Sequence, residues 1–436
     1  MAARQSLGAG QKMNIVVLGL WHLGCVTAAC CAEHFPVIGI DFDEGVVRDL
    51  SQGQAPLFEP GLDHLIKRQL EAGNLSFSSD SSRSLHSANV LWVCYDTPVD
   101  DNDVADNDYV LRRLEQCLPS IREGCLVLIS SQLPVGTCSR LQAKYPNLRF
   151  ACSPENLRLG HALESFRERD RVIAGVADDS ARGELTQLFA PFAADRMLWM
   201  RPESAEMIKH ATNAFLALSV TFANEMARLC ESHGANAYDL ARGLRSDARI
   251  GPKAYLRPGA AFAGGTLARD VVTLTHLAQS SKEEVPLIKA ILSSNDVHKQ
   301  WPLRQLEAAF LHLDQIKVAV LGLTYKPGTD TLRRSSSIEL CFHLLSHGCN
   351  VSCYDPAVNA LPVTLDRARL CSNLAEAIDG VAAIMLMTAW PEITQVDWTE
   401  LLRGLGREVV IIDVNHALNL PHGPLPHVRY FSLGSP

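Results

Sequence analysis

The chain has 436 residues, of which 47% are hydrophobic and 20% are charged. This is the composition of a globular protein with two or three domains, and it excludes fibrous, collagen-like and wholly disordered chains. No stretch approaches the roughly 18 to 20 apolar residues that span a bilayer, and the first residues lack the layout of a signal peptide, so we expect a cytoplasmic protein that does not associate with membranes.

Charge and cysteine spacing exclude two further classes of protein. The formal net charge is -8, with 40 Lys and Arg against 48 Asp and Glu, whereas a nucleic-acid binder needs a concentrated positive face. The 13 cysteines form no C-x-x-C pair and no ladder with histidine, so neither a disulfide framework nor a metal site is expected. Most of these thiols are predicted to be buried.

The first half of the chain has the pattern of a doubly wound domain. Residues 1–12 are polar and aperiodic, and we expect them to be disordered. From Met13, a branched apolar run over 14–20, a helical stretch to about residue 34 and a second run over 37–41 predict a parallel βαβ unit. Further buried strands are expected at 89–95, 125–130, 148–152 and 171–175.

The second half begins with helices and then repeats the βαβ pattern. Residues 204–233 predict one long helix, and helical character resumes after Val271 and runs to about residue 301. A second βαβ start at 317–322 precedes a helix at 337–347 and strands at 350–354, 381–388 and 408–413. The predicted fold class is therefore α/β, with two Rossmann-like doubly wound domains joined by a long central helix and a helical middle region.

The first strand is followed by a turn typical of dinucleotide binding. The turn reads Gly19-Leu-Trp21-His-Leu-Gly24, and Asp41 ends the next strand. In this fingerprint the first glycine makes the tight turn, the second lets the backbone approach a pyrophosphate, and the third lets helix and strand pack closely. Trp21 occupies the second position. Asp41 should bind a ribose 2′-hydroxyl, which favours NAD over NADP; the alternative is a turn that binds nothing.

Seven further segments follow in order from Met13 onward. They are Pro56-Leu-Phe-Glu-Pro-Gly-Leu62, Asp96-Thr-Pro98, Pro134-Val-Gly-Thr137, Pro154-Glu-Asn-Leu-Arg158, Ser204-Ala-Glu-Met-Ile-Lys-His-Ala-Thr-Asn-Ala-Phe215, Asp247-Ala-Arg-Ile-Gly-Pro-Lys253 and Gly322-Leu-Thr-Tyr-Lys-Pro-Gly-Thr-Asp330. Together these segments resemble the UDP-glucose/GDP-mannose dehydrogenase family. The resemblance implies an N-terminal NAD-binding Rossmann domain over 13–202, a central helical dimerisation domain over 203–302 and a C-terminal UDP-sugar-binding Rossmann-like domain over 314–436.

The family oxidises the C6 alcohol of a nucleotide sugar to a carboxylate with two NAD, and a cysteine carries the second half as a thiohemiacetal and then a thioester. Cysteine suits this step because part of it is thiolate near neutral pH. The family's Gly-Phe-Gly-Gly-Ser-Cys-Phe-Pro-Lys-Asp segment is similar to residues 261–270, which places Thr266 at the cysteine position. Beside the nicotinamide, Gln132 stands for a family Thr and Leu159 for a family Glu.

Other residues match the family at its catalytic centre. Lys209 and Asn213 lie four apart, on one face of a helix, and match residues that engage the sugar and the C6 oxygen. Asp270 matches the carboxylate that positions a water or base, and Glu155 matches another active-site carboxylate. A Lys ammonium can stabilise a developing alkoxide, and an Asp can accept the alcohol proton through water. Thr266 completes the catalytic set by position; its alternative is a loop hydroxyl, because no base is visible beside it.

The resemblance also assigns the binding residues. For the cofactor they are Gly19, Trp21, Gly24, Asp41, Thr97, Gln132, Arg269 and Arg333. For the substrate they are Glu155, Lys209, Asn213, Arg249, Tyr255, Gly259, Phe262 and Lys326, with Arg249 reaching the substrate from the partner subunit of a homodimer.

The expected function is NAD-dependent oxidation of a UDP-glucose-like nucleotide sugar at its C6 alcohol, to the aldehyde or through its hydrate to the uronate, without a cysteine thioester. The alternative is a catalytically weak or inactive nucleotide-sugar-binding homologue with a regulatory or scaffolding role. The residues that favour the alternative are Trp21, Gln132, Leu159 and Thr266. The residues that favour catalysis, because a pure binder has less need of them, are Lys209, Asn213, Glu155, Asp270 and Asp41.

Overall fold

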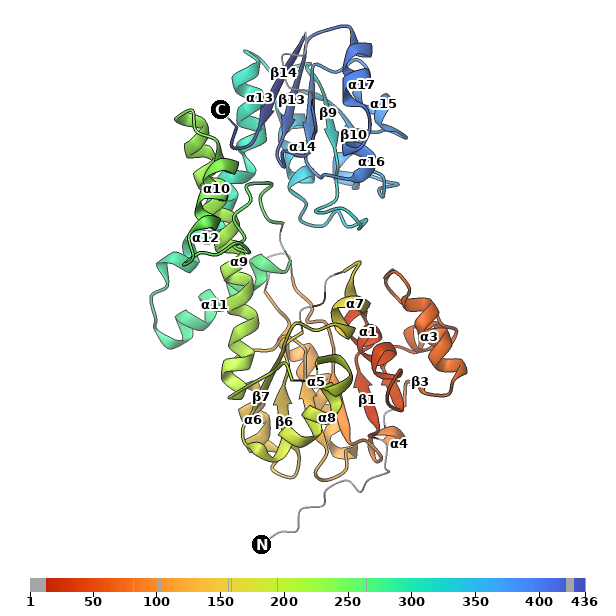
Figure 1. The fold of residues 1–436 in the computed structure, drawn as a ribbon. Coiled ribbons are helices and arrows are strands. Elements are labelled where there is room, and N and C mark those ends of the chain that lie inside the picture. Colours follow the sequence, from red (N-terminus) through yellow and green to blue (C-terminus); the bar gives the residue numbers. More distant parts are fainter. Residues whose placement is uncertain are drawn as a thin grey trace. The chain divides into compact units, whose positions relative to one another are not determined.

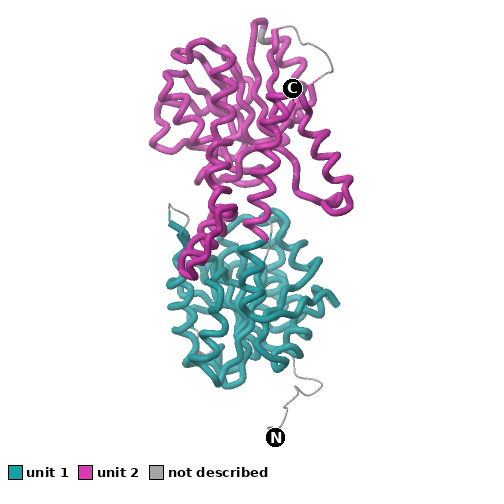
Figure 2. Tube along the Cα trace, turned by 90° about the vertical axis from the view of Figure 1, so that its left-hand side faces the viewer, with its two compact units in different colours: residues 1–211 teal, residues 212–436 magenta. Residues whose placement is uncertain are grey.

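A computed structural model describes residues 13–80, 82–100, 104–155, 157, 159–193, 195–263, 265–420 and 427–435. Residues 1–12, for which we expected disorder, lie outside this set, as do Asn156 and Arg158 of the fourth family-like segment. The chain divides into two compact units, Met1–Ala211 and Thr212–Pro436 (Figure 2). Each unit is described by itself.

The first unit is built on an eight-stranded sheet with the strand order β3-β2-β1-β4-β5-β6-β7-β8 (Figure 1). Neighbouring strands are parallel except β6 and β7, which are antiparallel. The strands are β1 (Ile15–Leu18), β2 (Val37–Ile40), β3 (Leu75–Ser78), β4 (Val90–Val93), β5 (Leu126–Ile129), β6 (Arg149–Cys152), β7 (Val172–Val176) and β8 (Met197–Met200). The sequence pattern predicted six of these strands and missed β3 and β8.

Helices cover both faces of this sheet. Alternate residues of β1 belong to different cores, since Ile15 and Val17 pack with α1 and α8, whereas Val16 and Leu18 pack with α5 and α6. Burial on both faces explains why β1 reads as a continuous apolar run. The helices are α1 (His22–Cys31), α2 (Glu44–Ser51), α3 (Leu62–Glu71), α4 (Ser82–Leu85), α5 (Asn107–Cys117), α6 (Thr137–Lys144), α7 (Ala162–Arg167) and α8 (Arg182–Ala193), with short 3₁₀ turns at Leu118–Ser120 and Asp179–Ala181.

The predicted long helix is α9 (Pro202–Ser232), and it is continuous across the boundary between the two units. The helical stretch expected from Val271 to residue 301 is interrupted. It forms α11 (Leu267–Ser281) and α12 (Pro286–Lys299), because Lys282 adopts a left-handed conformation with φ 59° and Pro286 begins the next helix. The other two helices of this region are α10 (Ala237–Ser246) and α13 (Trp301–Ala309).

The second unit carries a six-stranded parallel sheet with the order β11-β10-β9-β12-β13-β14, which repeats the order of the first six strands of the other sheet (Figure 1). Its strands are β9 (Lys317–Leu321), β10 (Asn350–Tyr354), β11 (Arg369–Leu370), β12 (Ala383–Leu386), β13 (Val409–Asp413) and β14 (Val428–Ser432). Its helices are α14 (Ser336–Ser346), α15 (Leu374–Ile378), α16 (Pro391–Thr394) and α17 (Trp398–Leu405), with a 3₁₀ turn at Val363–Leu365. Strands β11 and β14 were not predicted. Both sheets therefore have the Rossmann strand order, as the sequence indicated.

No helix among the residues that the structure describes is long and apolar enough to cross a membrane.

Two glycines of the first turn are required by the packing of β1 on α1. Gly19 has φ +92°, and a Cβ there would lie 2.7 Å from the ring of Tyr95. A Cβ on Gly24 would lie 1.7 Å from the carbonyl oxygen of Gly19. Neither position can accept a side chain unless strand and helix separate, which is the physical basis of the glycine pattern at this turn.

Substituting Gly24→Ala should lower the melting temperature of the first unit by roughly 3 to 10 °C, because the methyl group would force α1 away from the turn. The matched control is Gly183→Ala, also in a helix, where a Cβ would meet nothing within 4 Å. The control should be neutral or slightly stabilising. Thermal unfolding followed by circular dichroism measures both variants, and equal melting temperatures would contradict the packing argument.

Candidate active site

The turn after β1 is held by the carboxylate that ends β2. Asp41 Oδ2 accepts the N–H of Leu20 at 2.8 Å, and Asp41 Oδ1 accepts the N–H of Asp43 at 3.2 Å. Each carboxylate oxygen has a second lone pair, so Asp41 can still accept a ribose hydroxyl. The predicted residues Gly19, Gly24 and Asp41 therefore lie together at the carboxyl ends of β1 and β2.

The N-terminus of α1 suits a pyrophosphate. Its first N–H groups have no acceptor within the helix, Trp21 gives no side-chain cap, and the first turn holds no acidic residue. Trp21 is 47% exposed. The N–H groups at this helix start and the absence of an acidic residue in its first turn fit the dinucleotide predicted from the sequence.

Two further predicted cofactor residues meet at the ends of β4 and β5. The hydroxyl of Thr97 donates to the carbonyl oxygen of Gln132 at 2.7 Å. The side-chain amide of Gln132 donates to Nδ1 of His210, on α9, at 3.1 Å. Gln132 is thus fixed at both its backbone and its side chain, so the residue that replaces the family threonine has a defined position.

Glu155 follows β6 and makes an ion pair that the sequence did not predict. Arg169 Nη1 lies 2.6 Å from Glu155 Oε2, and the side chains are only 5% and 11% exposed. We assigned Glu155 to catalysis and substrate binding, and this arrangement commits its carboxylate to a neighbouring guanidinium. Arg169 carries no motif, so only the fold could reveal the pair.

Asn213 and Asp270 are paired in the second unit. Asn213 Nδ2 donates to Asp270 Oδ2, and both residues are buried. Asp270 lies in the first turn of α11, where a carboxylate is also favoured by the helix dipole. Lys209 stands one turn before Asn213 on α9 and is half-buried. The spacing of four residues read from the sequence is therefore a true helical spacing.

Thr266, which the sequence resemblance places at the position of the family cysteine, precedes α11. It is exposed, and its hydroxyl does not cap the helix that it begins. Asp270 follows one turn later, and Arg269 lies beside it in the same turn. The Thr266 hydroxyl therefore takes no part in capping the helix.

The loop that carries Gly259 and Phe262 is clamped at its backbone. Gly259 N–H donates to Asn224 Oδ1 at 3.0 Å, and Phe262 N–H donates to Asn295 Oδ1 at 3.0 Å, while Asn295 Nδ2 returns a bond to the Phe262 carbonyl at 2.9 Å. Asn415 Oδ1 accepts the N–H of Ala260 at 3.1 Å. The predicted sugar loop is thus set by amide side chains from elsewhere in the second unit.

A buried histidine completes this clamp. Arg228 donates to Nδ1 of His298 at 2.8 Å, so the proton of the neutral ring is on Nε2, which donates to the Gly259 carbonyl at 2.9 Å. Burial lowers the pKa of His298 to about 4. His298 is therefore neutral at pH 7, and no motif in the sequence predicted its role.

The remaining predicted binding residues are more exposed. Arg249 forms an ion pair of 2.7 Å with Asp247, two residues away, and Tyr255 is 58% exposed. Arg333 is exposed and Lys326 is half-buried, with its ammonium 5.6 Å from the ring centre of Tyr325.

Glu59 lies in the family-like segment Pro56–Leu62, but we predicted no role for it from the sequence. Its carboxylate accepts the N–H groups of Gly160 at 2.9 Å and Ala162 at 2.8 Å, and His22 Nε2 donates to it at 3.0 Å. Burial opposes ionisation of Glu59, but these backbone N–H groups and His22 hold its pKa below the ordinary value. Glu59 thereby ties the turn containing Leu159 to the first turn of α1.

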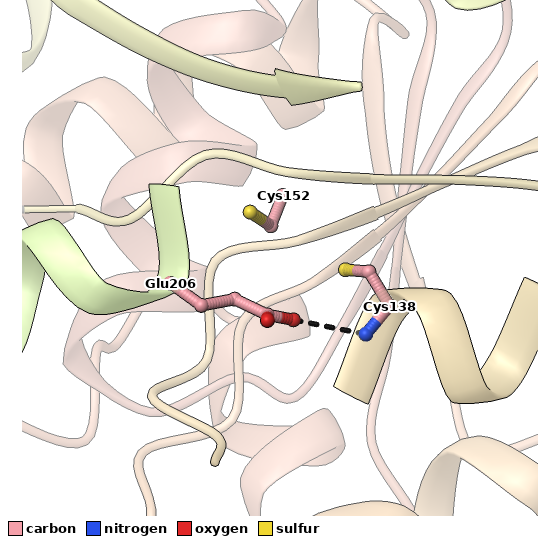
Figure 3. A group of neighbouring side chains, drawn as sticks. All are labelled: Cys138, Cys152 and Glu206. Carbon is pink, nitrogen blue, oxygen red and sulfur yellow. Dashed lines mark hydrogen bonds between the residues drawn. The ribbon is translucent and has the colours of Figure 1, made fainter. Parts of the chain in front are cut away.

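Cys138, Cys152 and Glu206 form a cluster whose ligand atoms all lie within 4.8 Å of one another (Figure 3). Glu206 Oε2 accepts the N–H of Gly136 at 2.5 Å, and Oε1 accepts the N–H of Cys138 at 2.9 Å. A hydrogen bond with Cys152 and burial raise the pKa of the Cys138 thiol, which disfavours the thiolate that a metal would need. The cluster is better described as a carboxylate cap on α6, supplied by α9.

Fold and site together define a protein with two Rossmann-like units, of which the first carries a dinucleotide turn. Three family models match the chain: the NAD binding domain of the UDP-glucose/GDP-mannose dehydrogenase family over residues 13–193, its central domain over 203–297 and its UDP binding domain over 319–420. The chain therefore belongs to the UDP-glucose/GDP-mannose dehydrogenase family, and NAD is its cofactor.

Similar proteins span its whole length. The UDP-glucose 6-dehydrogenase of Pseudomonas aeruginosa is 34% identical over 422 residues, covering 92% of this chain and 93% of the relative. That of Rhizobium meliloti is 32% identical over 441 residues, covering 97% and 100%. The solved structure of a UDP-glucose dehydrogenase from Pyrobaculum islandicum has a TM-score of 0.86 at 28% identity and covers 100% of both chains.

The depressed pKa of His298 predicts a stability that falls in acid. In the unfolded chain this histidine binds a proton near pH 6.5, whereas in the folded second unit it does so near pH 4. Between pH 7 and pH 5 the free energy of unfolding should therefore fall by about 1 to 2 kcal/mol through this residue.

Urea unfolding at the two pH values tests this. His298→Gln keeps a donor for the Gly259 carbonyl but cannot titrate, so its stability should depend less on pH. The exposed His312 provides the control, and His312→Gln should behave as the unchanged protein. The same pH dependence in all three proteins would contradict a buried neutral histidine.

Proposed function

We propose that the protein oxidises a UDP-glucose-like nucleotide sugar at its C6 alcohol with NAD, without a cysteine thioester. The observation that carries the proposal is the buried hydrogen bond between Asn213 and Asp270. Thr266, which immediately precedes α11, stands at the position of the family cysteine. Groups for alcohol oxidation are present, and the thiol for the second oxidation is replaced by a hydroxyl. Dehydrogenase relatives over the full length do not favour a binding-only homologue.

The acid–base roles follow from the chemistry of the groups. The half-buried ammonium of Lys209 can stabilise the alkoxide that forms at C6. The Asp270 carboxylate can accept the proton, directly or through water, and the Asn213 amide fixes one of its oxygens. The Asn213 amide therefore orients the Asp270 carboxylate and contacts one of its two oxygens.

NAD, when bound, accepts the hydride that leaves C6. The alcohol R–CH₂OH thereby becomes the aldehyde R–CHO and releases one proton. A second oxidation requires addition of water to the aldehyde and loss of a second hydride, because a thioester needs a thiol and Thr266 offers only a hydroxyl. We favour an end at the aldehyde over oxidation through the hydrate.

The substrate class rests on the clamped loop and on the relatives. The side chains of Asn224, Asn295 and His298 hold the loop of Gly259 and Phe262 in one conformation, and such rigidity lowers the cost of ordering a loop around a ligand. The relatives from Pseudomonas aeruginosa and Rhizobium meliloti are UDP-glucose 6-dehydrogenases. A UDP-hexose is therefore the substrate that we propose, with Lys326, Arg333 and Arg269 as phosphate-binding cations and Arg249 as a contact from the partner subunit.

Domain division and assembly are part of the same proposal. The divisions 13–202, 203–302 and 314–436 are supported by the family-model ranges. One face of α9 exposes Phe215, Phe222 and Leu229, with 67%, 44% and 53% exposure. These residues repeat every seven positions, as in a helix that packs on a second helix. We propose that this face joins two copies of the chain.

The redox proposal predicts one NADH per molecule of sugar and a product two hydrogen atoms lighter than the substrate. Asp270→Asn should lower kcat by about 10² to 10⁴, because it removes the proton acceptor. Thr266→Ala should change kcat by less than about threefold, because the hydroxyl is not the nucleophile.

The NADH yield and the activity of both variants are tested by measuring absorbance at 340 nm and product mass with a panel of UDP- and GDP-sugars. Two NADH per sugar would show oxidation through the hydrate. Loss of turnover in Thr266→Ala would mean that the Thr266 hydroxyl takes part in the reaction, which contradicts the proposal. No NADH with any sugar, despite calorimetric binding of one, would leave only the binding homologue.

The dimer proposal predicts that Phe222→Glu weakens self-association by about tenfold or more, because a charge would be buried in the apolar face. Leu311→Glu is the control, since Leu311 is 97% exposed and lies outside α9. Sedimentation equilibrium measures both variants and the unchanged protein. A monomeric unchanged protein, or equal dissociation constants in all three, would refute the assignment of this face.

A further inference from the structure

Arg113, on α5, is a cation to which the sequence resemblance assigned no role. Its guanidinium carbon lies 4.9 Å from the ring centre of Phe42 and 5.5 Å from that of Tyr109. All three residues are half-buried, so part of each remains in contact with solvent. Within the described part of the chain Arg113 forms no ion pair, whereas its neighbour Arg112 lies 3.9 Å from the Asp106 carboxylate. The contacts of Arg113 are therefore with aromatic rings and not with an acid.

These side chains lie at the same edge of the first sheet as the ribose acceptor. Phe42 directly follows Asp41 at the end of β2, and Tyr109 and Arg113 lie one helical turn apart on α5, which follows β4. Strands β2 and β4 pair with β1 from opposite sides, so the strand order reverses between β1 and β4. In open α/β sheets a dinucleotide binds beyond the carboxyl ends of the strands at such a reversal.

Tyr95, two residues after β4, joins these side chains to the turn after β1. Its ring packs against Gly19, and it meets the Tyr109 ring edge-on, with the ring centres 5.8 Å apart. Burial, and after it the Asp41 carboxylate, raise the pKa of the Tyr95 hydroxyl, whereas Arg113 lowers it. This hydroxyl is buried and has no hydrogen-bond partner among the described residues. The ribose acceptor and Arg113 therefore lie near the same buried group.

We infer that Arg113 binds the adenine of NAD, with Phe42 as the second part of the surface on which the base packs. The adenine is attached to the ribose that Asp41 is expected to bind, so it lies close to Asp41 and to the residue that follows it. An arginine suits this role, because its flat and weakly hydrated guanidinium stacks on aromatic rings and on nucleobases. The inference rests on NAD as the cofactor and not on the sugar that is oxidised.

Calorimetry tests the inference by direct binding, without turnover. The ligands are NADH and ADP-ribose, which keeps the adenosine end of the cofactor and lacks the nicotinamide. Arg113→Met should raise the Kd of both ligands by about 3- to 30-fold, because it removes the cation and keeps an unbranched side chain. The matched control is Arg112→Met on the same helix, where the arginine side chain is 65% exposed. Its two Kd values should stay within about twofold of those of the unchanged protein.

Two further measurements separate stacking on the base from attraction to the phosphates. The loss of affinity in Arg113→Met should persist at roughly 0.5 M salt, where a contact between a cation and a phosphate is screened. Arg113→Lys keeps the charge but has no flat group to stack, so it should still raise both Kd values by about twofold or more. Circular dichroism shows whether each variant is folded, and Arg113→Lys decides if Arg113→Met is not.

The inference is overturned if either ligand keeps its affinity in folded Arg113→Met or in Arg113→Lys, if the loss disappears at high salt, or if Arg112→Met weakens binding equally. An unchanged protein that binds neither NADH nor ADP-ribose overturns it as well. A protein that binds NADH as expected but oxidises no nucleotide sugar contradicts the proposed function alone and leaves the role of Arg113 intact.

Discussion

Buried side-chain oxygens hold the loops at the carboxyl ends of both sheets, and the sites depend on this. A loop N–H removed from water must find an acceptor. Asp41 accepts one beside the dinucleotide turn, Glu59 accepts two from the turn after Leu159, and Glu206 accepts two at the start of α6. The amides of Asn224, Asn295 and Asn415 do the same for the loop that contains Gly259. The fold itself therefore fixes the backbone of each of these loops.

In each unit a carboxylate at the end of one strand binds the turn that follows the neighbouring strand, but the two carboxylates accept different numbers of hydrogen bonds. Asp355 ends β10 as Asp41 ends β2, and its Oδ2 accepts the N–H of Leu323 at 2.7 Å. In the second unit, however, Thr324 and the Trp390 indole also donate to that oxygen, and Asp355 is only 3% exposed. A buried carboxylate oxygen that already accepts several hydrogen bonds from its own unit cannot also bind a ribose hydroxyl. The repeated strand order thus gives two similar scaffolds, of which only the first keeps an acceptor available for a dinucleotide.

Local patterns in the sequence were sufficient to predict the fold class and the residues of the turn after β1. Apolar runs predicted the central strands, and Gly19, Gly24 and Asp41 lie together as their spacing indicated. The edge strands β3, β8, β11 and β14 were missed because they are short or partly exposed and lack a continuous apolar run. Glu155 with Arg169, and His298 with Gly259, could not be predicted, because each pair joins loops or helices whose proximity depends on the tertiary fold. Asn213 with Asp270 was assigned by resemblance, but only the structure shows that they are bonded to each other.

The burial of the cysteines has a consequence for the chemical durability of the protein. None of the 13 forms a disulfide and all are buried, and burial raises the pKa of Cys125 to about 11 and of Cys30 to about 12. Alkylating agents and peroxides react with exposed thiolates. While the fold is intact, the buried cysteines of this chain should therefore react slowly with such reagents.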